Sequence, residues 1–227
     1  MTRYMLVSLA VLVSTVSPSL ALPLIEFSPD PSTAGNWSYD GANSVLAFEQ
    51  DVVVDRGVGS NSDALVNAHV YIPTMLVTGS NGLYGLTPIG TSEIKITNST
   101  GDQVYMSGML SQGSLNTIGT IGAGYSDFST DITDVIITPE GQALGSAALA
   151  ILGLSAEPGE ATLDFELALQ GASSANYRSF AAMIDGGFSG NSGFSGAMSV
   201  PEPTTVALLG LGALGLAKRR NKKNKLI

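Results

Sequence analysis

Short stretches in which apolar and polar residues alternate recur along the central part of the chain, and this pattern restricts the possible folds more than any other feature. The odd-numbered residues of 163–169 (LDFELAL) are apolar, and so are the even-numbered residues of 66–72 (VNAHVYI). Clusters of Gly, Asn, Ser and Asp separate these stretches. Because successive side chains of a strand point to opposite faces, the pattern predicts β-strands with one buried and one solvated face.

Further stretches extend this prediction to an all-β protein. Residues 93–97 and 103–106 alternate in the same way, and the Asn-Ser-Thr-Gly-Asp sequence between them is typical of a hairpin loop. We expect about eight to eleven strands, which favours an antiparallel β-sandwich or jelly roll. The remaining candidate strands are residues 45–48, 131–137, 179–184 and 188–200.

Two segments fit more than one structure. Residues 142–154 place Leu144, Ala147 and Ile151 at helical spacing, which predicts one short helix, although an interior strand fits the same residues. Residues 187–199 contain Gly-Phe-Ser-Gly twice and fit either a Gly-rich final strand or a flexible stalk. The predicted β-sandwich body therefore covers residues 22–186, and this final strand or stalk follows it.

The N-terminal residues 1–21 have the pattern of a secretory signal peptide, with a signal helix. Arg3 provides the positive charge, residues 5–16 form an apolar run, and Ser19 and Ala21 are the small residues expected at a signal peptidase cleavage site. Cleavage after Ala21 starts the mature chain. An uncleaved N-terminal anchor is the alternative, because the residues after Ala21 stay mostly apolar.

The C-terminal residues 200–227 combine a proline-rich motif, a short apolar run and a basic tail, in that order. Two prolines remove amide donors and favour extended neighbours, so residues 200–205 are predicted to form an exposed linker. As a transmembrane helix, residues 204–217 would measure about 21 Å, which is short against roughly 30 Å of bilayer hydrocarbon. The tail, residues 218–227, predicts a cytoplasmic membrane stop. It begins with Lys218, Arg219 and Arg220.

This C-terminal segment resembles the PEP-CTERM sorting signals of exported proteins from Gram-negative bacteria. The resemblance implies recognition by an exosortase, a membrane-embedded cysteine transpeptidase-like enzyme, with cleavage near the Pro-Glu-Pro sequence and release or transfer of the protein. It also implies an association with exopolysaccharide production. The residues that carry it are Val200, Pro201, Glu202 and Pro203, the Leu, Gly and Ala residues of 208–216, and the pair Arg219 and Arg220.

The body that remains between the two signals is strongly acidic. Residues 22–199 contain 18 Asp or Glu residues against Arg56, Lys95 and Arg178, which gives a net charge of −15, compared with −9 for the whole chain. Nucleic-acid binding is excluded, because it depends on Lys and Arg that neutralise phosphates. The chain has no cysteine, so disulfides, cysteine-zinc sites and thiol nucleophiles are excluded as well.

Candidate catalytic groups are few. His69 is the only histidine, it lies on the polar face of a predicted strand, and the chain lacks the Gly-x-Ser-x-Gly elbow. Asp164 and Glu166 lie two residues apart on one predicted strand face, as in a glycosidase pair, but strand alternation explains their placement without catalysis. We therefore expect a protein that is not an enzyme.

Calcium is the ion that the composition favours, because hard oxygen donors are abundant in the body. The candidate ligands are Asp127, Asp131 and Asp134. Solvated acidic loops explain the same residues better, so we expect no obligatory cofactor.

These observations predict an exported, non-enzymatic surface or extracellular-matrix protein, linked through its sorting signal to exopolysaccharide and biofilm. Signal peptidase and exosortase are its expected processing partners. The inner membrane is the expected transient anchor, and the cell surface or matrix of a Gram-negative bacterium is the destination. Two other hypotheses stay open: a carbohydrate-binding or calcium-dependent adhesive module, and a secreted hydrolase.

Overall fold

The computed structural model describes residues 23–29, 37–48, 52–118, 125–154, 163–170 and 179–200. Within these residues the chain is mostly β-strand, with three short helices. The strands are β1 (Ile25–Pro29), β2 (Trp37–Asp40), β3 (Val45–Phe48), β4 (Val52–Gly57), β5 (His69–Tyr71), β6 (Met75–Ser80), β7 (Leu83–Pro88), β8 (Glu93–Thr97), β9 (Val104–Leu110), β10 (Gly113–Ile118), β11 (Tyr125–Ile137), β12 (Leu163–Gln170), β13 (Gly190–Ser192) and β14 (Phe194–Ser199). The helices are α2 (Pro139–Ala143), α3 (Ala147–Leu154) and α4 (Phe180–Asp185).

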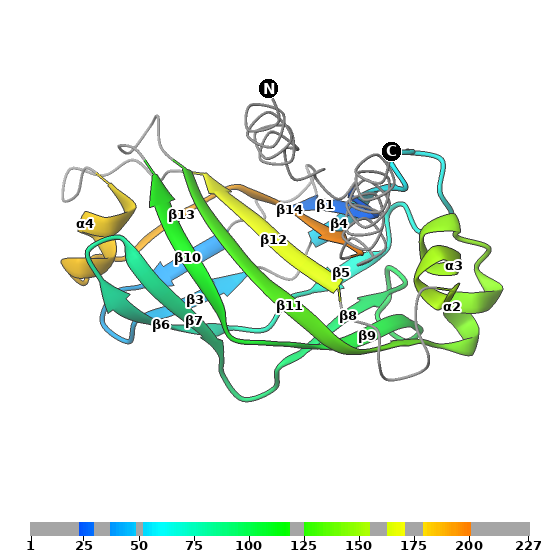
Figure 1. Ribbon diagram of the computed structural model, residues 1–227, viewed down its shortest axis with the longest axis horizontal. Coiled ribbons are helices and arrows are strands. Elements are labelled where there is room, and N and C mark those ends of the chain that lie inside the picture. The colour runs from blue at the N-terminus through cyan, green and yellow to red at the C-terminus, as the bar shows by residue number, and fades with distance from the viewer. Residues whose placement is uncertain are drawn as a thin grey trace, which may run out of the picture.

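Eight of the strands form a closed antiparallel barrel (Figure 1). Their order is β12, β14, β1, β4, β5, β8, β9 and β11, and β11 pairs again with β12 to close the ring. The pairing of β14 with β1 joins the two ends of the described chain and places Gly196 opposite Phe27. Closure leaves no free strand edge in this ring.

The other six strands extend the barrel along its axis. Each of them closely precedes or follows a ring strand in the sequence, as β2 follows β1 and β3 precedes β4. They pair in the order β10, β7, β6, β3, β2 and β13, and β10 also pairs with the first half of β11. On the other side, the amide of Gln170 donates to the carbonyl of Gly193, beside β13, at 3.0 Å. The fold is therefore an up-and-down meander of eight long antiparallel segments.

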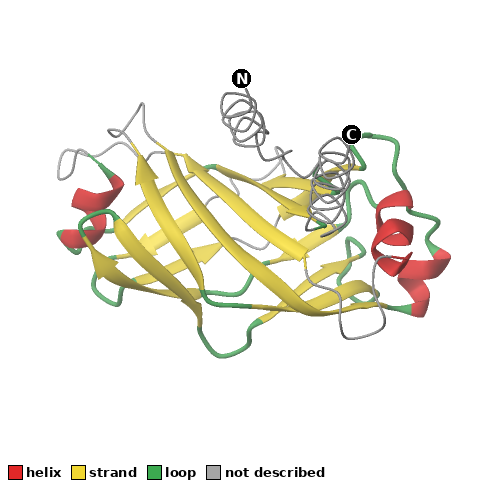
Figure 2. Ribbon diagram, viewed as in Figure 1, coloured by secondary structure: helices red, strands yellow, loops and turns green. Residues whose placement is uncertain are grey.

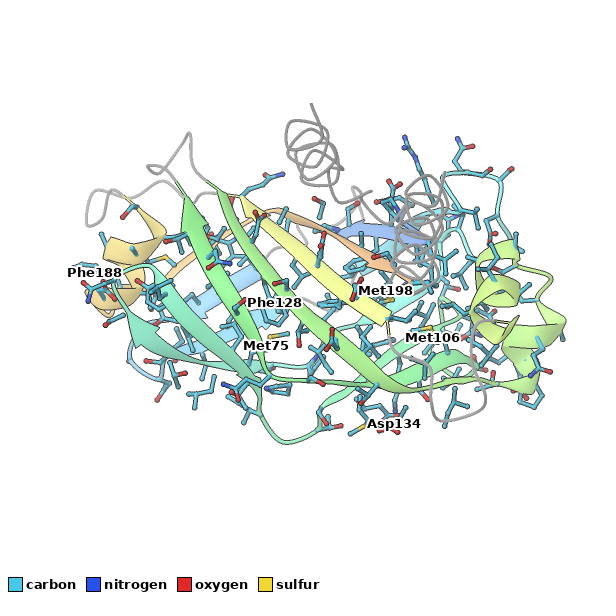
Figure 3. The ribbon with its side chains drawn as sticks, viewed as in Figure 1. Met75, Met106, Phe128, Asp134, Phe188 and Met198 are labelled. Carbon is cyan, nitrogen blue, oxygen red and sulfur yellow. The ribbon has the colours of Figure 1, made fainter. Side chains whose placement is uncertain are left out.

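Alternating residues of these strands fill the interior with apolar side chains. The odd-numbered residues of β12 are at most 1 % exposed, whereas the even-numbered ones are half-buried or exposed. Phe165 stacks on Phe27 with ring centroids 5.7 Å apart, and it meets Phe128 edge to face at 6.2 Å. Figure 3 shows Phe128, Met75 and Met198 within the barrel. The centre is a packed hydrophobic core.

The two ends of the barrel carry different elements. The terminal end consists of loops 58–68 and 98–103, helices α2 and α3, the start of β1 and the end of β14. The distal end consists of turns 41–44 and 81–82 and helix α4. Figures 1 and 2 show the helices at these opposite ends, with strands between them.

Helix α4 packs over the core at the distal end. Ser179 caps it by accepting a hydrogen bond from the amide of Ala182. Phe180 and Met183, three residues apart, point to the barrel and are at most 5 % exposed. The ring of Phe180 lies 5.2 Å from that of Trp37. This capping and spacing explain why residues 179–184, predicted as a strand, form a helix instead.

The sequence predicts the class of this fold more accurately than its connections. The prediction of an antiparallel all-β protein is confirmed. The predicted sandwich or jelly roll differs from the structure, because each long segment pairs with its neighbours in the sequence and the ring closes. The single helix predicted over 142–154 is two helices, separated where Gly145 adopts a φ of +76°. The strand predicted over 66–72 begins only at His69, after Asn67 with a φ of +68°.

None of the helices in the described ranges has the length and apolar character required to span a bilayer. The predicted signal helix of residues 1–21 and the predicted membrane helix of residues 204–217 lie outside these ranges.

Candidate functional site

The end of β14 leads directly into the Pro-Glu-Pro sequence. Ser199 is the last residue of β14 and lies opposite Asp164 of β12. Val200 is half-buried and packs against the core. Only Val200 therefore separates the last barrel strand from the first proline of the motif. The other predicted sorting and membrane-stop residues, Pro201, Glu202, Pro203, Lys218, Arg219 and Arg220, lie outside the described residues.

The first described residues leave the barrel beside this exit. The amide of Leu24 donates to the carbonyl of Met198 at 2.8 Å, and the amide of Val58 donates to the carbonyl of Leu24 at 2.7 Å. Ser19 and Ala21 of the predicted signal cleavage site precede the described residues. The chain therefore enters and leaves the barrel at neighbouring points of the terminal end.

Asp63 fastens the loop 58–68 to helix α3 at this end. Its carboxylate accepts hydrogen bonds from the amides of Leu65 at 2.9 Å, Ala147 at 2.9 Å and Ala148 at 3.2 Å. Burial raises the pKa of Asp63, but the hydrogen bonds from Ser146 and from these amides outweigh it and hold the pKa below its ordinary value. Asp63 and Ala147 are 84 residues apart in the sequence, so no local pattern predicts this contact.

Val58 has a backbone conformation that β-branched residues rarely adopt. Its φ is +51°, and that of Gly59 is +69°. Gly57 and Ser60 exchange two backbone hydrogen bonds of 2.9 Å across these residues, which defines a tight hairpin turn. The side chain of Val58 is 45 % exposed. The flanking glycines are the only sequence signal for a turn at this position.

An acidic groove lies on the outer face of the barrel, over β4, β1, β14, β12 and β11. Its volume is about 510 Å³. Burial raises the pKa of Asp127 in its wall. The small side chains of Ser195 and Ala197 on β14 leave room between the strands that carry the acids. The carboxylates that line it are those of Glu26, Asp55, Asp127 and Glu166.

Asp164 and Glu166 share the outward face of β12, as the alternation predicts. Asp164 lies opposite Asp131 of β11, and Glu166 lies opposite Ser129. Burial, and then the negative charge of Asp131, raise the pKa of Asp164. The two carboxylates border a shallow hollow of about 320 Å³ on this face. A raised pKa suits a general acid, but here burial and the like charge of Asp131 account for it without any catalytic role.

The structure does not bring the predicted calcium ligands together. Asp127 and Asp131 lie four residues apart on β11, which separates them by about 13 Å along the strand. Asp134 is exposed at a bulge of β11 with a φ of +52°, and Figure 3 shows it at the edge of the barrel. In the ranges that the structure describes, no three His, Asp or Glu side chains approach closely enough to hold a metal ion.

The remaining candidate residues, one for catalysis and two for sugar binding, are half-buried or buried. His69 begins β5, is half-buried, and lies opposite Val53 and Thr97 on the neighbouring strands. Trp37 and Tyr84, two of the aromatic residues that a sugar-binding site would use for stacking, are at most 4 % exposed.

Comparison with known proteins finds one relationship, at the C-terminus. The family model of the PEP-CTERM protein-sorting motif matches residues 199–222. No curated protein and no solved structure matches the chain. The matched segment begins at Ser199, the final residue of the barrel, and the motif implies processing by an exosortase. The chain is therefore an exported protein that carries a PEP-CTERM sorting signal at its C-terminus.

Proposed function

We propose that this protein is a non-enzymatic component of the cell surface or extracellular matrix of a Gram-negative bacterium. Signal peptidase removes residues 1–21, an exosortase acts at the Pro-Glu-Pro sequence, and the barrel is released or transferred as a finished domain associated with exopolysaccharide. The observation that carries the proposal is the position of the sorting motif, which begins at the last residue of β14. A cut beyond Val200 leaves every strand of the barrel intact.

The construction of the barrel supports a role in the matrix. A closed ring without free edges resists pairing with other chains, which suits a protein that accumulates outside the cell. The body carries a net charge of −15 between residues 22 and 199, which favours solubility in a hydrated matrix. Among its candidate sugar-stacking aromatics, Trp37, Tyr39 and Tyr84 are buried and Tyr71 and Tyr105 are half-buried, which favours a structural role over a carbohydrate-binding site.

The acidic groove supports a secreted hydrolase as the second candidate function. Asp127 and Glu166 face the same groove from neighbouring strands, and burial raises the pKa of Asp127. Polysaccharide hydrolysis that is lost in both Asp127→Asn and Glu166→Gln would favour this candidate. Glu93→Gln, on β8 outside the groove, is the matched control.

Processing tests the main proposal. The full chain is expressed with and without an exosortase, and its intact mass is compared between the wild type and the double variant Pro201→Ala/Pro203→Ala. We expect the wild type to lose its C-terminal segment only when the exosortase is present, and the double variant to keep it. Loss of residues 1–21 to signal peptidase is expected in every sample. Thr204→Ser/Thr205→Ser, which keeps both prolines, should be processed like the wild type. Retention of the C-terminal segment in every sample contradicts the proposal.

A further inference from the structure

The terminal end of the barrel holds both chain exits in a fixed position. Leu24 is hydrogen-bonded to Met198, and Val200 packs against the core. Twenty-two residues precede Pro23 and 27 follow Val200. Only five residues separate Val200 from Val206, the first apolar residue after the motif in the predicted membrane helix, so the connecting chain spans at most about 20 Å. Any membrane that holds this run therefore lies close to the terminal end.

Helix α3 gives the terminal end an uncharged surface. Its sequence, AALAILGL, contains no charged residue. Ala148, Leu149 and Leu152 are buried against the barrel, whereas Ala147 and Ala150 are exposed. A hollow of about 480 Å³ lies beside the helix. Its lining is almost wholly small or apolar: Ile137, Gly141, Gly145, Ala147, Leu149, Ala150 and Gly153, with Gln142 and Ser146 as the polar members.

Val58 lies beside the chain exits at the same end of the barrel. Its amide is bonded to Leu24, and its loop is bonded to α3 through Asp63. The turn conformation of Val58 suits Asn or Gly better than a β-branched residue, yet its side chain is 45 % exposed to solvent. A strained backbone that presents an apolar side chain outward indicates a contact outside the barrel rather than a need of the core.

Charge distinguishes the terminal end from the wall of the barrel. The wall carries Glu26, Asp127 and Glu166 in one groove, and such a surface is repelled by anionic headgroups. At the terminal end the carboxylate of Asp63 is occupied by backbone amides. Asp102 in the loop 98–103 is exposed and accepts hydrogen bonds from the side chains of Asn98 and Thr100, and Glu140 on α2 is exposed. A barrel that stands on its terminal end therefore keeps the distal acids Asp40 and Asp185, and the wall acids Asp127 and Glu166, away from a membrane surface.

We propose that the terminal end of the barrel is a lipid-docking surface, on which Val58 and the exposed residues of α3 contact the bilayer interface while the C-terminal signal is held in the membrane. This inference rests on the proposed function, because it takes the sorting segment to be membrane-bound before processing. Docking stands the barrel upright, with α4 pointing away from the membrane. It also holds the Pro-Glu-Pro sequence at the interface, where a membrane-embedded enzyme acts.

Single-cysteine labelling tests the orientation, because the natural chain contains no cysteine. The full chain is reconstituted without exosortase into vesicles of phosphatidylcholine, alone or with one quarter phosphatidylglycerol. An environment-sensitive fluorophore is attached at Ala150→Cys on α3 or at Ala42→Cys in the distal turn, both exposed alanines. We expect lipid-borne quenchers near the headgroups to quench the label at position 150 at least about threefold more than the label at position 42. Equal quenching, stronger quenching at position 42, or failure of the chain to float with the vesicles overturns the proposal.

Val58→Asn should weaken the contact with lipid without weakening the fold. Asn fits the turn better than Val, so the variant should be at least as stable as the wild type. We expect it to lower the quenching of a label at Ala147→Cys by about twofold, because one apolar contact with the interface is lost. Unchanged quenching overturns the assignment of Val58. The assay contains no exosortase, so failure of docking leaves the processing result intact, and failure of processing leaves the docking result intact.

Discussion

Gly196 of β14 lies directly under the ring of Phe27 of β1: a Cβ atom at position 196 would stand 2.3 Å from two ring carbons. Gly196→Ala should therefore force the ring out of its stack with Phe165 and destabilise the barrel by about 1–3 kcal/mol. Urea unfolding measures the change. Gly153→Ala in α3 is the matched control, because no atom lies within 4 Å of its added Cβ, and it should stabilise the protein by about 0.5–1 kcal/mol. Equal effects at the two positions would contradict the packing argument.

Tyr84 and Asp185 join the β6–β7 hairpin to helix α4. The Tyr84 hydroxyl donates to the Asp185 carboxylate at 2.9 Å and lies 3.2 Å from the carbonyl of Ala181. Burial, and then Asp185, raise the pKa of Tyr84 to about 12. A pKa above the ordinary 10.0 means that this stability is present below pH 10 and is lost as the pH rises through about 12.

Tyr84→Phe tests this contact. It should cost about 1–2 kcal/mol at neutral pH and flatten the loss of stability between pH 10 and 12. Unfolding followed at a series of alkaline pH values measures both effects. Tyr105→Phe, at a half-buried tyrosine of β9, is the control. An alkaline profile of Tyr84→Phe that matches the wild type would remove Tyr84 as its cause.

Asp63→Asn should loosen helix α3 from the loop 58–68. The carboxylate accepts three backbone amides, and an Asn side chain presents only one acceptor oxygen to them. We expect a loss of about 1–2 kcal/mol at pH 7. The folded pKa of Asp63 lies below the ordinary 3.8, so its contribution is present above that pH and is lost as the pH falls through the folded pKa. The difference in the free energy of unfolding between wild type and Asp63→Asn should therefore become smaller in acid, as urea unfolding at several pH values would measure.

Asp164→Asn should raise the stability of the protein at pH 7, whereas Asp63→Asn should lower it. Burial and the charge of Asp131 raise the pKa of Asp164 above 3.8, so its favourable contribution is present in acid and is lost as the pH rises through the folded pKa. Removing the charge should stabilise the protein by about 0.5 kcal/mol at pH 7 and have little effect near pH 3. Comparing Asp164→Asn with Asp131→Asn and the double variant measures the coupling. Additive effects would show that the two carboxylates do not interact.

Local patterns in the sequence predict strands in the regions of β3, β5, β8, β9, β11, β12 and β13–β14, because the period of two survives in segments such as residues 163–169. They miss β1, β2, β4, β6, β7 and β10. The helix at residues 180–185 is missed because Phe180 and Met183 are read as strand residues, although Ser179 offers a capping signal. Closure of the barrel depends on pairs such as Phe27 and Gly196, which no local pattern connects. The sheet class was therefore predictable from the sequence, whereas the closed ring was not.

The functional features also differ in whether a local pattern in the sequence can predict them. The Pro-Glu-Pro motif is a linear signal, so the sequence alone identifies it, and the family match confirms it. The contact between Asp63 and Ala147, and the adjacency of Leu24 and Met198, exist only in the folded chain. The candidate calcium ligands Asp127, Asp131 and Asp134 are not brought together, because Asp127 and Asp131 lie about 13 Å apart along an extended strand.

The effect of Val58→Asn on stability bears directly on the proposed membrane contact of Val58. Its φ of +51° costs a β-branched residue about 1–2 kcal/mol relative to a residue suited to the left-handed region. Val58→Asn should therefore raise the midpoint of urea unfolding, with an unchanged slope, by an amount equivalent to about 1 kcal/mol. Val52→Ala, which removes a buried valine from the adjoining strand, should lower it. A lower midpoint for Val58→Asn would mean that Val58 packs favourably within the barrel. A higher midpoint would mean that the protein keeps Val58 at the expense of stability, as expected for a side chain that makes a contact outside the fold.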